Sequence, residues 1–254
     1  MEKKDLLKDV IKHIDIKSYD STQLIDAMRN MSFTSRDTAR AADILMMMCK
    51  EKECTNILTL AGSTSAAGCM QVYVDMVRNK MIDVVVATGA SIIDMDLFEA
   101  LGYKHYIGEK ENVIPDTTLR DLYIDRIYDT YIDEEELQAC DHSTYELANM
   151  LEARPYSSRE FIYEIGKWLH NGKAVKKDSL IQTCYECGVP IFVPAFSDSS
   201  AGFGIGKHQW ERMQKGEKYL SIDSVKDFVE LTQIKMQAPE TGLFMIGGGT
   251  PKNF

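Results

Sequence analysis

Four short apolar runs, each followed at once by small and polar residues, constrain the fold of this 254-residue chain more than any other feature. The runs contain β-branched residues, have the length of buried strands, and occupy residues 55–60, 82–87, 189–193 and 242–246. Helical patterns alternate with them, which is typical of a parallel sheet with right-handed crossovers. Strands that are apolar almost throughout are expected where helices cover both faces. The sequence therefore predicts an α/β fold with a Rossmann-like parallel sheet flanked by helices.

Several predicted helices carry an apolar stripe at helical spacing, and Ser157 with Glu160 forms an S-x-x-E capping box. The predicted helices span residues 21–31, 35–50, 66–79, 96–101, 134–152, 157–169, 178–186 and 222–236. Residues 109–135 are acidic and rich in tyrosine, and we expect a solvated connection or an insertion of short elements there. No repeat, linker or low-complexity tract interrupts the chain, so residues 1–254 are predicted to form a single domain.

Composition and charge narrow the class of protein. The net charge of −10 argues against nucleic acid or an anionic membrane as a partner, because both attract basic patches. No apolar window approaches the ~20 residues of a membrane span, and the N-terminus lacks the apolar core of a signal peptide. Together with six scattered cysteines, this predicts a cytoplasmic protein. Cys184 and Cys187 have C-x-x-C spacing but lie in an apolar helical pattern, so we expect packing rather than a redox or metal site.

The residues that follow the four strands predict a ligand site, because parallel strands place their carboxyl ends along one edge of a sheet. The four segments are A-G-S-T-S (61–65), T-G-A-S (88–91), the segment with Asp198, Ser199 and Ser200, and G-G-G (247–249). Small, hydroxyl and glycine residues let backbone N–H groups approach phosphate or ribose, so a dinucleotide is the natural ligand. The G-x-G-x-x-G fingerprint is absent, and Gly202, Gly204 and Gly206 are predicted to form a flexible loop. A surface loop with an Asx or Ser turn is the alternative interpretation of the third segment.

Longer motifs follow one another in a fixed order along the chain. They are AGSTSAAG (61–68), TGASIIDMD (88–96), FEALGYKHYIG (98–108), RIYDTYIDEE (126–135), PIFVPAFSDSSAGFG (190–204), SIDSVKDFVELT (221–232) and MIGGGTPKNF (245–254). This succession resembles the deoxyhypusine synthase family over nearly the whole chain, from about Ile14 to Phe254. The segments DSSAGFG and GGGTPKNF are most similar to the bacterial deoxyhypusine synthase-like branch, with homospermidine synthases as relatives.

The resemblance implies a Rossmann-like fold and a homotetramer built of tight dimers, with NAD bound at the dimer interface. It implies that NAD oxidises spermidine and that the aminobutyl group passes through an enzyme lysine to an acceptor amine. The acceptor is a lysine of a translation-factor precursor in one part of the family and a small polyamine such as putrescine in another. The expected activity is therefore that of an NAD-dependent aminobutyltransferase of polyamine metabolism.

The resemblance also assigns roles to individual residues. It implies NAD contacts at Ser63, Thr64, Ser65, Thr88, Gly89, Ala90, Asp198 and Gly248. It places Asp94 near the polyamine and the nicotinamide, after a one-residue shift of the alignment. Carboxylates suit this role because they hold a cationic amine and position the carbon that loses hydride. No metal is expected.

Two substrate-binding positions depart from the family's pattern. Phe203 stands where deoxyhypusine synthases have an aspartate that grips spermidine, and Asn253 stands where they have a histidine near the amine. Both departures favour a different acceptor or a different polyamine.

The family's catalytic lysine lies in a pattern like S-W-G-K, which this chain does not contain. We therefore expect a C-terminally truncated member that lacks the last strands and helices of the family fold and is inactive alone. A non-catalytic subunit that joins a paralogue in a mixed tetramer is the alternative. A Rossmann-like nucleotide-binding module without polyamine chemistry is the remaining interpretation.

Overall fold

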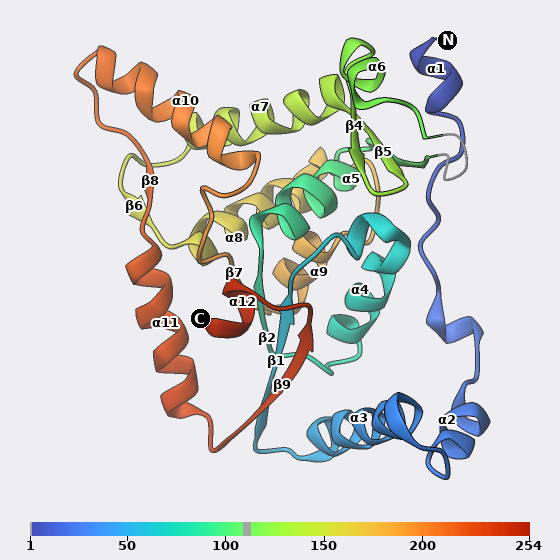
Figure 1. The fold of residues 1–254 in the computed structure, drawn as a ribbon. Coiled ribbons are helices and arrows are strands. Elements are labelled where there is room, and N and C mark those ends of the chain that lie inside the picture. Colours follow the sequence, from blue (N-terminus) through green and yellow to red (C-terminus); the bar gives the residue numbers. More distant parts are fainter. Residues whose placement is uncertain (1, 109–112) are drawn as a thin grey trace.

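The computed structural model describes residues 2–108 and 113–254, and its centre is a parallel sheet (Figure 1). The order of the strands is β7 (Ile191–Phe192), β2 (Val84–Ala87), β1 (Cys54–Leu60) and β9 (Glu240–Ile246). Every pairing is parallel, and Leu58 in β1 lies beside Val85 of β2 on one side and Phe244 of β9 on the other. The four predicted strands and the α/β fold with a parallel sheet are confirmed.

The two faces of this sheet are covered unequally. Successive strand residues point to opposite faces, so β1 sends Ile57 to one face and Leu58 to the other. Leu58 belongs to the main core, which includes residues of α4 (Met70–Arg78), α8 (Ser158–Trp168) and α9 (Leu180–Cys187). The opposite face is covered by α11 (Ser224–Gln237) and the short α12 (Thr250–Asn253). Its smaller cluster comprises Ile57, Val84, Val86 and Phe192 with Leu231 and Ile234.

The helices that follow the strands begin with irregular turns. The π-helical segment η2 (Ser65–Cys69) precedes α4 and is interrupted at Gly68, whose φ is +95°. After β2, η3 (Ala90–Leu97) runs directly into α5 (Phe98–Ala100), so the helix predicted from residue 96 begins earlier, at Ala90. Further helices are the short η1 (Ile16–Ser18), α2 (Thr22–Met28), α3 (Phe33–Lys50), α7 (Glu134–Met150) and η4 (Leu169–Lys173). The predicted helices are thus confirmed, with ends that shift by a few residues.

The acidic stretch at residues 109–135 is an insertion of short elements, which was one of the two structures expected there. Residues 109–112 lie outside the described residues. It contributes α6 (Asp116–Asp121), β4 (Ile124–Ile127) and β5 (Thr130–Asp133), and an antiparallel sheet forms in the order β3-β5-β4 with β3 (His105–Ile107). A small cluster of Leu6, Ile114, Leu119, Ile124 and Tyr131 joins this sheet to α1 (Lys3–Leu6).

The predicted flexible loop at Gly202, Gly204 and Gly206 is wrong, because these residues lie in α10 (Ala201–Gln214). A Cβ on Gly204 would lie 2.5 Å from the carbonyl oxygen of Asp141 in α7, and one on Gly202 would lie 2.5 Å from that of Ser197. Glycine is therefore present where α10 closely approaches other backbone, a reason that spacing along the sequence does not reveal.

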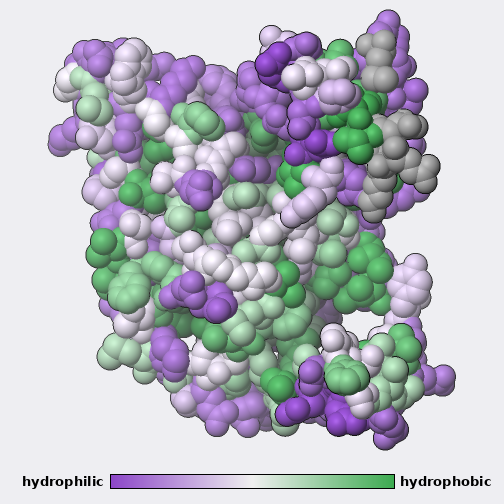
Figure 2. Space-filling model, in the orientation of Figure 1, coloured by the Kyte–Doolittle hydropathy of each residue, from purple (hydrophilic) through white to green (hydrophobic). Residues whose placement is uncertain are grey.

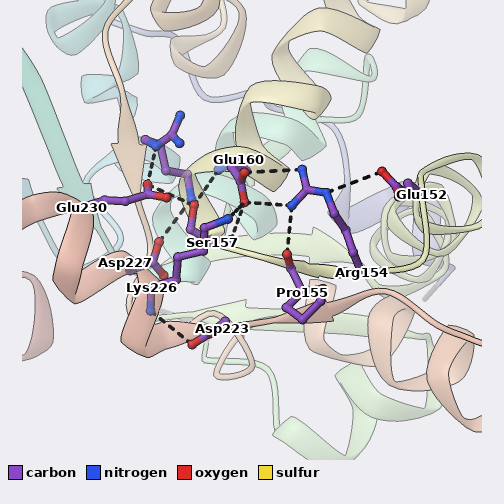
Figure 3. A network of polar contacts seen from close by, with 10 residues as sticks. Glu152, Arg154, Pro155, Ser157, Glu160, Asp223, Lys226, Asp227 and Glu230 are labelled. Atoms are coloured by element: carbon purple, nitrogen blue, oxygen red, sulfur yellow. Dashed lines mark hydrogen bonds and ion pairs between the residues drawn. The ribbon is translucent and has the colours of Figure 1, made fainter.

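A network of charged side chains joins the start of α8 to α11 (Figure 3). Glu160 lies at its centre and accepts hydrogen bonds from Arg154 at 3.2 Å and Lys226 at 2.5 Å. The same carboxylate accepts from the Ser157 N–H at 2.9 Å while the Ser157 hydroxyl accepts from the Glu160 N–H, which confirms the predicted capping box. Beside it, β6 (Pro155–Tyr156) pairs with β8 (Ser221–Ile222). The network fixes α8, which packs on β7, relative to the opposite face of the sheet.

Helices that could cross a membrane were sought in the described parts of the chain, and none is both long and apolar enough.

Candidate functional site

The loops predicted to form a ligand site lie at the carboxyl edge of the parallel sheet. The Ala61 N–H donates to the Ile246 carbonyl at 2.9 Å, which joins the loop after β1 to the end of β9. The Ser91 hydroxyl donates to the Gly62 carbonyl at 3.1 Å, which joins the loops after β1 and β2. The structure therefore brings these segments together, as parallel strands require.

The loop after β7 presses against the loop after β2. A Cβ on Gly89 would lie 2.6 Å from the Ser199 hydroxyl oxygen, so this approach needs glycine. The Ser199 hydroxyl donates to the Phe196 carbonyl at 2.8 Å, and Asp198 is exposed beside it. The segment is thus a tight turn at the shared edge, and its hydroxyl bond runs back to a carbonyl rather than forming an Asx or Ser turn.

The loop after β1 contains a buried hydroxyl group without a partner. Thr64 Oγ1 and the Tyr73 hydroxyl are 2.7 Å apart and share a hydrogen bond. Ser65 is only 1% exposed, and its hydroxyl has no hydrogen-bond partner among the described residues. An unsatisfied buried hydroxyl costs about 1–3 kcal/mol, so a ligand oxygen that bonds to it would be stabilised. Ser63 lies two residues before Ser65, and the Ser63 carbonyl accepts a hydrogen bond from the Ala67 N–H at 3.0 Å.

The loop after β2 leads directly into a helix. Thr88 Oγ1 lies 2.9 Å from Ser91 Oγ, Gly89 is the residue before the helix, and Ala90 is its first residue. The first N–H groups of a helix have no intrahelical acceptor and favour anions. Thr88, Gly89 and Ala90 therefore lie where a phosphate group would find donors.

Asp94 in η3 contacts Ser200, the residue directly before α10. Its carboxylate accepts from the Ser200 N–H at 3.0 Å and from the Ser200 hydroxyl at 2.7 Å. Burial raises the pKa of Asp94, although these hydrogen bonds oppose the shift, and the charge of Asp198 adds to it. The carboxylate thus connects the second loop of the edge to the third.

Asp141 in α7 is a third carboxyl group at this place, and the sequence did not reveal it. Burial raises the pKa of Asp141 to about 6, which the Ser200 hydroxyl opposes and the neighbouring charge of Asp94 increases. Its Oδ1 is buried without a hydrogen-bond partner among the described residues. The only signal in the sequence is the position next to Cys140, a residue of the predicted apolar stripe, and this could not show that Asp94 is near.

Phe203 is brought into the same neighbourhood. It lies on the first turn of α10, is 76% exposed, and lines a cavity of about 370 Å³ between α7 and α10. Asp141 and Tyr145 line the same cavity. Phe203 therefore presents an apolar surface close to the carboxylates.

The two predicted site residues after β9, Gly248 and Asn253, lie in different parts of the structure. Gly248 belongs to the turn after β9, in which a Cβ on Gly247 would lie 2.7 Å from the Ala61 carbonyl oxygen. Asn253, in α12, instead lines a cavity of about 470 Å³ together with Phe228 and Leu243 on the α11 face of the sheet. The lining of that cavity includes neither Asp94 nor Phe203, so the structure does not bring Asn253 to the other two substrate positions.

The residues at the edge fit a dinucleotide. The unpartnered Ser65 hydroxyl and the N–H groups at the helix start at Ala90 are donors suited to a pyrophosphate group, and Gly89 lets the loop with Ser199 pack against this helix start. No group of three metal-ligating side chains occurs among residues 2–108 and 113–254. Cys184 packs in the main core, as expected, whereas Cys187 is exposed.

The fold and the edge define the class as an α/β protein with a parallel sheet whose carboxyl-end loops form a candidate ligand site. The sequence profile of deoxyhypusine synthase matches residues 23–254. A deoxyhypusine synthase-like protein of Caulobacter vibrioides is 64% identical over 253 residues, which are 100% of this chain and 68% of the relative. A protein of the same description from Coxiella burnetii is 59% identical, over 99% of this chain and 70% of its own.

A solved structure shares the fold. The crystal structure of a protein described as a deoxyhypusine synthase from Entamoeba histolytica superposes with a TM-score of 0.65 at 20% identity, over 94% of this chain and 82% of that chain. The chain belongs to the deoxyhypusine synthase family. The resemblance read from the motifs is thereby confirmed, and the family points to a transferase.

Proposed function

We propose that the complete protein is an NAD-dependent transferase that moves the aminobutyl group of spermidine, or of a related polyamine, to an acceptor amine. The observation that carries this proposal is the contact between Asp94 and Ser200, which places a half-buried carboxylate beside the loops that fit a dinucleotide. NAD, when bound, supplies the hydride acceptor of the reaction.

The loops at the sheet edge are proposed to hold the dinucleotide. Their contacts would come from Ser63, Thr64, Ser65, Thr88, Gly89, Ala90, Asp198 and Gly248. The Ser65 hydroxyl would donate to a phosphate oxygen and so gain the partner that it lacks among the described residues. Asp198, which is exposed at the same edge, is suited to accept from ribose hydroxyls.

The carboxylates are proposed to hold the ammonium groups of the polyamine. Burial raises the pKa of Asp94 and that of Asp141, and a nearby ammonium group would stabilise the ionised form of each. Phe203 would pack against the methylene chain between two amines. Asn253 lies in another cavity of this chain, so a contact with the substrate would need a different arrangement of α12.

The proposal extends to assembly and compartment. Large apolar side chains are exposed on α11 and β9, and Figure 2 shows hydrophobic residues gathered over this part of the molecule. They are Phe228, Val229, Met236, Leu243 and Met245. Because monomers rarely expose extended apolar patches, we propose a homo-oligomer, a homotetramer built of tight dimers as the family resemblance implies. Free cysteines, six in the described chain, suit the reducing cytoplasm in which we place the protein.

The test uses the full-length protein with NAD and spermidine, in the presence and absence of putrescine, with products identified by mass spectrometry. We expect homospermidine if a small polyamine is the acceptor and a mass increase on a protein lysine if it is not. Asp94→Asn should lower kcat/KM for spermidine about 100-fold, because a buried ammonium would lose its counter-charge. Its affinity for NAD should change little.

Asp121→Asn, at an exposed carboxylate in α6, is the matched control and should leave both constants unchanged. If the full-length protein binds NAD but yields neither product, the protein is a nucleotide-binding module and the proposed transfer is wrong. If it binds no NAD, the proposed cofactor is wrong as well.

A further inference from the structure

An extended segment, residues 7–20, runs along one side of the molecule from α1 to α2 and passes α4 (Figure 1); we call it the arm. The arm is first anchored on β3 through a single antiparallel bridge between Val10 and Tyr106. The Ile107 N–H donates to the Asp9 carbonyl at 2.7 Å, and the Ile11 N–H donates to the His105 carbonyl at 2.9 Å. These bonds fix the beginning of the arm to the antiparallel sheet, away from the candidate site.

The arm then crosses to the turn that follows the first loop of the candidate site. The Ile14 N–H donates to the Gly68 carbonyl at 2.9 Å. The Lys12 carbonyl oxygen would lie 2.8 Å from a Cβ on Gly68, so the two backbones touch. Gly68 belongs to η2, and the Ala67 N–H of the same segment donates to Ser63 at 3.0 Å. The arm is therefore in contact with the structure that shapes the Ser63–Ser65 loop.

His13 is the polar side chain that links the arm to both α4 and α5. The Met70 N–H, at the start of α4, donates to His13 Nδ1 at 3.2 Å. Because Nδ1 accepts, the proton of the neutral ring is on Nε2, and Nε2 donates to Glu99 at 2.6 Å. One imidazole thus joins the start of α4 to Glu99 of α5.

Glu99 is held firmly in place by other groups. His105 Nδ1 lies 2.9 Å from Oε1, and Lys176 forms an ion pair with Oε2. Burial opposes the charge of Glu99, but the hydrogen bonds from His105 and His13 and the charge of Lys176 hold its pKa well below its usual range. The acceptor for His13 therefore stays ionised at neutral pH.

Apolar packing beneath the arm is incomplete. A cavity of about 330 Å³ lies there, and its lining includes Val10, Ile11 and His13 of the arm and Tyr103 and Val175 of the body. Where packing leaves this much space, hydrogen bonds decide the position of a segment to a greater degree. His13 bonds to both α4 and α5, whereas Lys17, the other side chain that ties the arm to α4, pairs there with Asp75 alone.

We propose that His13 is a positioning residue for the dinucleotide-binding loop. Through Met70 it fixes the turn that carries Ser63, Thr64 and Ser65, beside the contacts of Lys12 and Ile14 with Gly68, and the arm acts as a brace between this turn and Glu99. His13 touches none of the atoms that would contact NAD. The inference rests on the proposed function, because NAD binding by this loop is what gives the position of the turn a consequence.

The test measures NAD affinity by calorimetry and amide hydrogen exchange of residues 63–70 in the full-length protein. His13→Ala should weaken NAD binding about five- to tenfold, the effect of losing roughly one hydrogen bond, and should speed exchange of the Met70 amide. His13→Asn keeps an acceptor near the position of Nδ1 and should restore most of the affinity. His13→Gln keeps a donor toward Glu99 but no acceptor for Met70 and should restore less.

His170→Ala is the matched control, since His170 is exposed and bonds to Glu186 elsewhere on the surface. Unchanged NAD affinity in His13→Ala, or a lower melting temperature without faster exchange at residues 63–70, would overturn the inference. If the wild-type protein binds no NAD, the proposed function fails separately. In that case, an unchanged exchange rate of the Met70 amide in His13→Ala still shows that His13 does not brace the turn. A faster rate shows that it does, and only the proposed effect on NAD binding is then wrong.

Discussion

Two buried aspartates each accept hydrogen bonds from N–H groups at the start of a helix distant in sequence. Asp96 in η3 accepts from Leu180 at 2.8 Å and from Ile181 at 2.7 Å, at the start of α9. Asp227 in α11 accepts from the Arg159 N–H at 3.4 Å, at the start of α8. Both helices pack on the same sheet face, so these two carboxylates connect the helices of the core to neighbouring elements.

The same carboxylates predict a dependence of stability on pH. Burial raises the pKa of Asp227 to about 6 from an ordinary 3.8, although hydrogen bonds from Ser158 and Arg159 oppose the shift. Between these pH values the folded protein binds the proton more tightly than the unfolded chain, so this contribution to stability falls as pH rises through about 6. Relative to Asp227→Asn, the wild type should gain about 1 kcal/mol of unfolding free energy between pH 7.5 and pH 5.

Urea unfolding at the two pH values measures this difference. Asp121→Asn, on an exposed carboxylate, should follow the wild type at both. A difference between the wild type and Asp227→Asn that does not change with pH would contradict the assigned pKa.

At the scale of elements, the contact between α7 and α10 shapes the candidate amine site. Gly204 allows α10 to approach the Asp141 carbonyl, and the same approach places Phe203 over the cavity that Asp141 lines. The helices therefore position the two side chains that face the proposed polyamine. The distance between the two helices depends on the absence of a side chain at Gly204, so a substitution there tests it.

Gly204→Ala should force the two helices apart. Its Cβ would lie 2.5 Å from the Asp141 carbonyl oxygen, and relief of such overpacking costs about 1–3 kcal/mol of unfolding free energy. Gly206→Ala, where nothing among the described residues lies within 4 Å, should instead gain up to about 1 kcal/mol from helix propensity. Denaturant unfolding of both variants decides the matter. Equal effects of the two substitutions would mean that close packing is not the reason for Gly204.

These examples show what the sequence could predict about elements and what it could not. The strands were predictable because each, such as residues 55–60, is a local apolar run whose burial needs no knowledge of its neighbours. The helix α10 was missed because Gly204 reads as a loop residue until its contact with α7 is known. Asp141 was missed for the same reason, since its proximity to Asp94 arises from packing between elements far apart in sequence.

At the scale of the whole molecule, the unequal covering of the sheet is the dominant feature. One face and the helices on it form the main core, whereas the other carries a small cluster and leaves Leu243 of β9 and Met236 of α11 largely exposed. β9 is also an edge strand, paired only with β1 among the described strands. An edge strand beside exposed apolar side chains is a surface that proteins normally cover.

The proposed oligomer would cover this surface, and charged substitutions there should weaken it. Leu243→Lys and Met236→Lys place a charge on exposed apolar positions, so neither has to disrupt the core, and both should shift the full-length protein to smaller species in sedimentation velocity. Tyr128→Lys, on a fully solvated turn between β4 and β5, changes a comparable apolar area on the antiparallel sheet and should leave the assembly intact. Circular dichroism confirms that each variant is folded. If both substitutions on this face leave the sedimentation coefficient at the wild-type value, the apolar face is not the interface, and the oligomer must form through another surface.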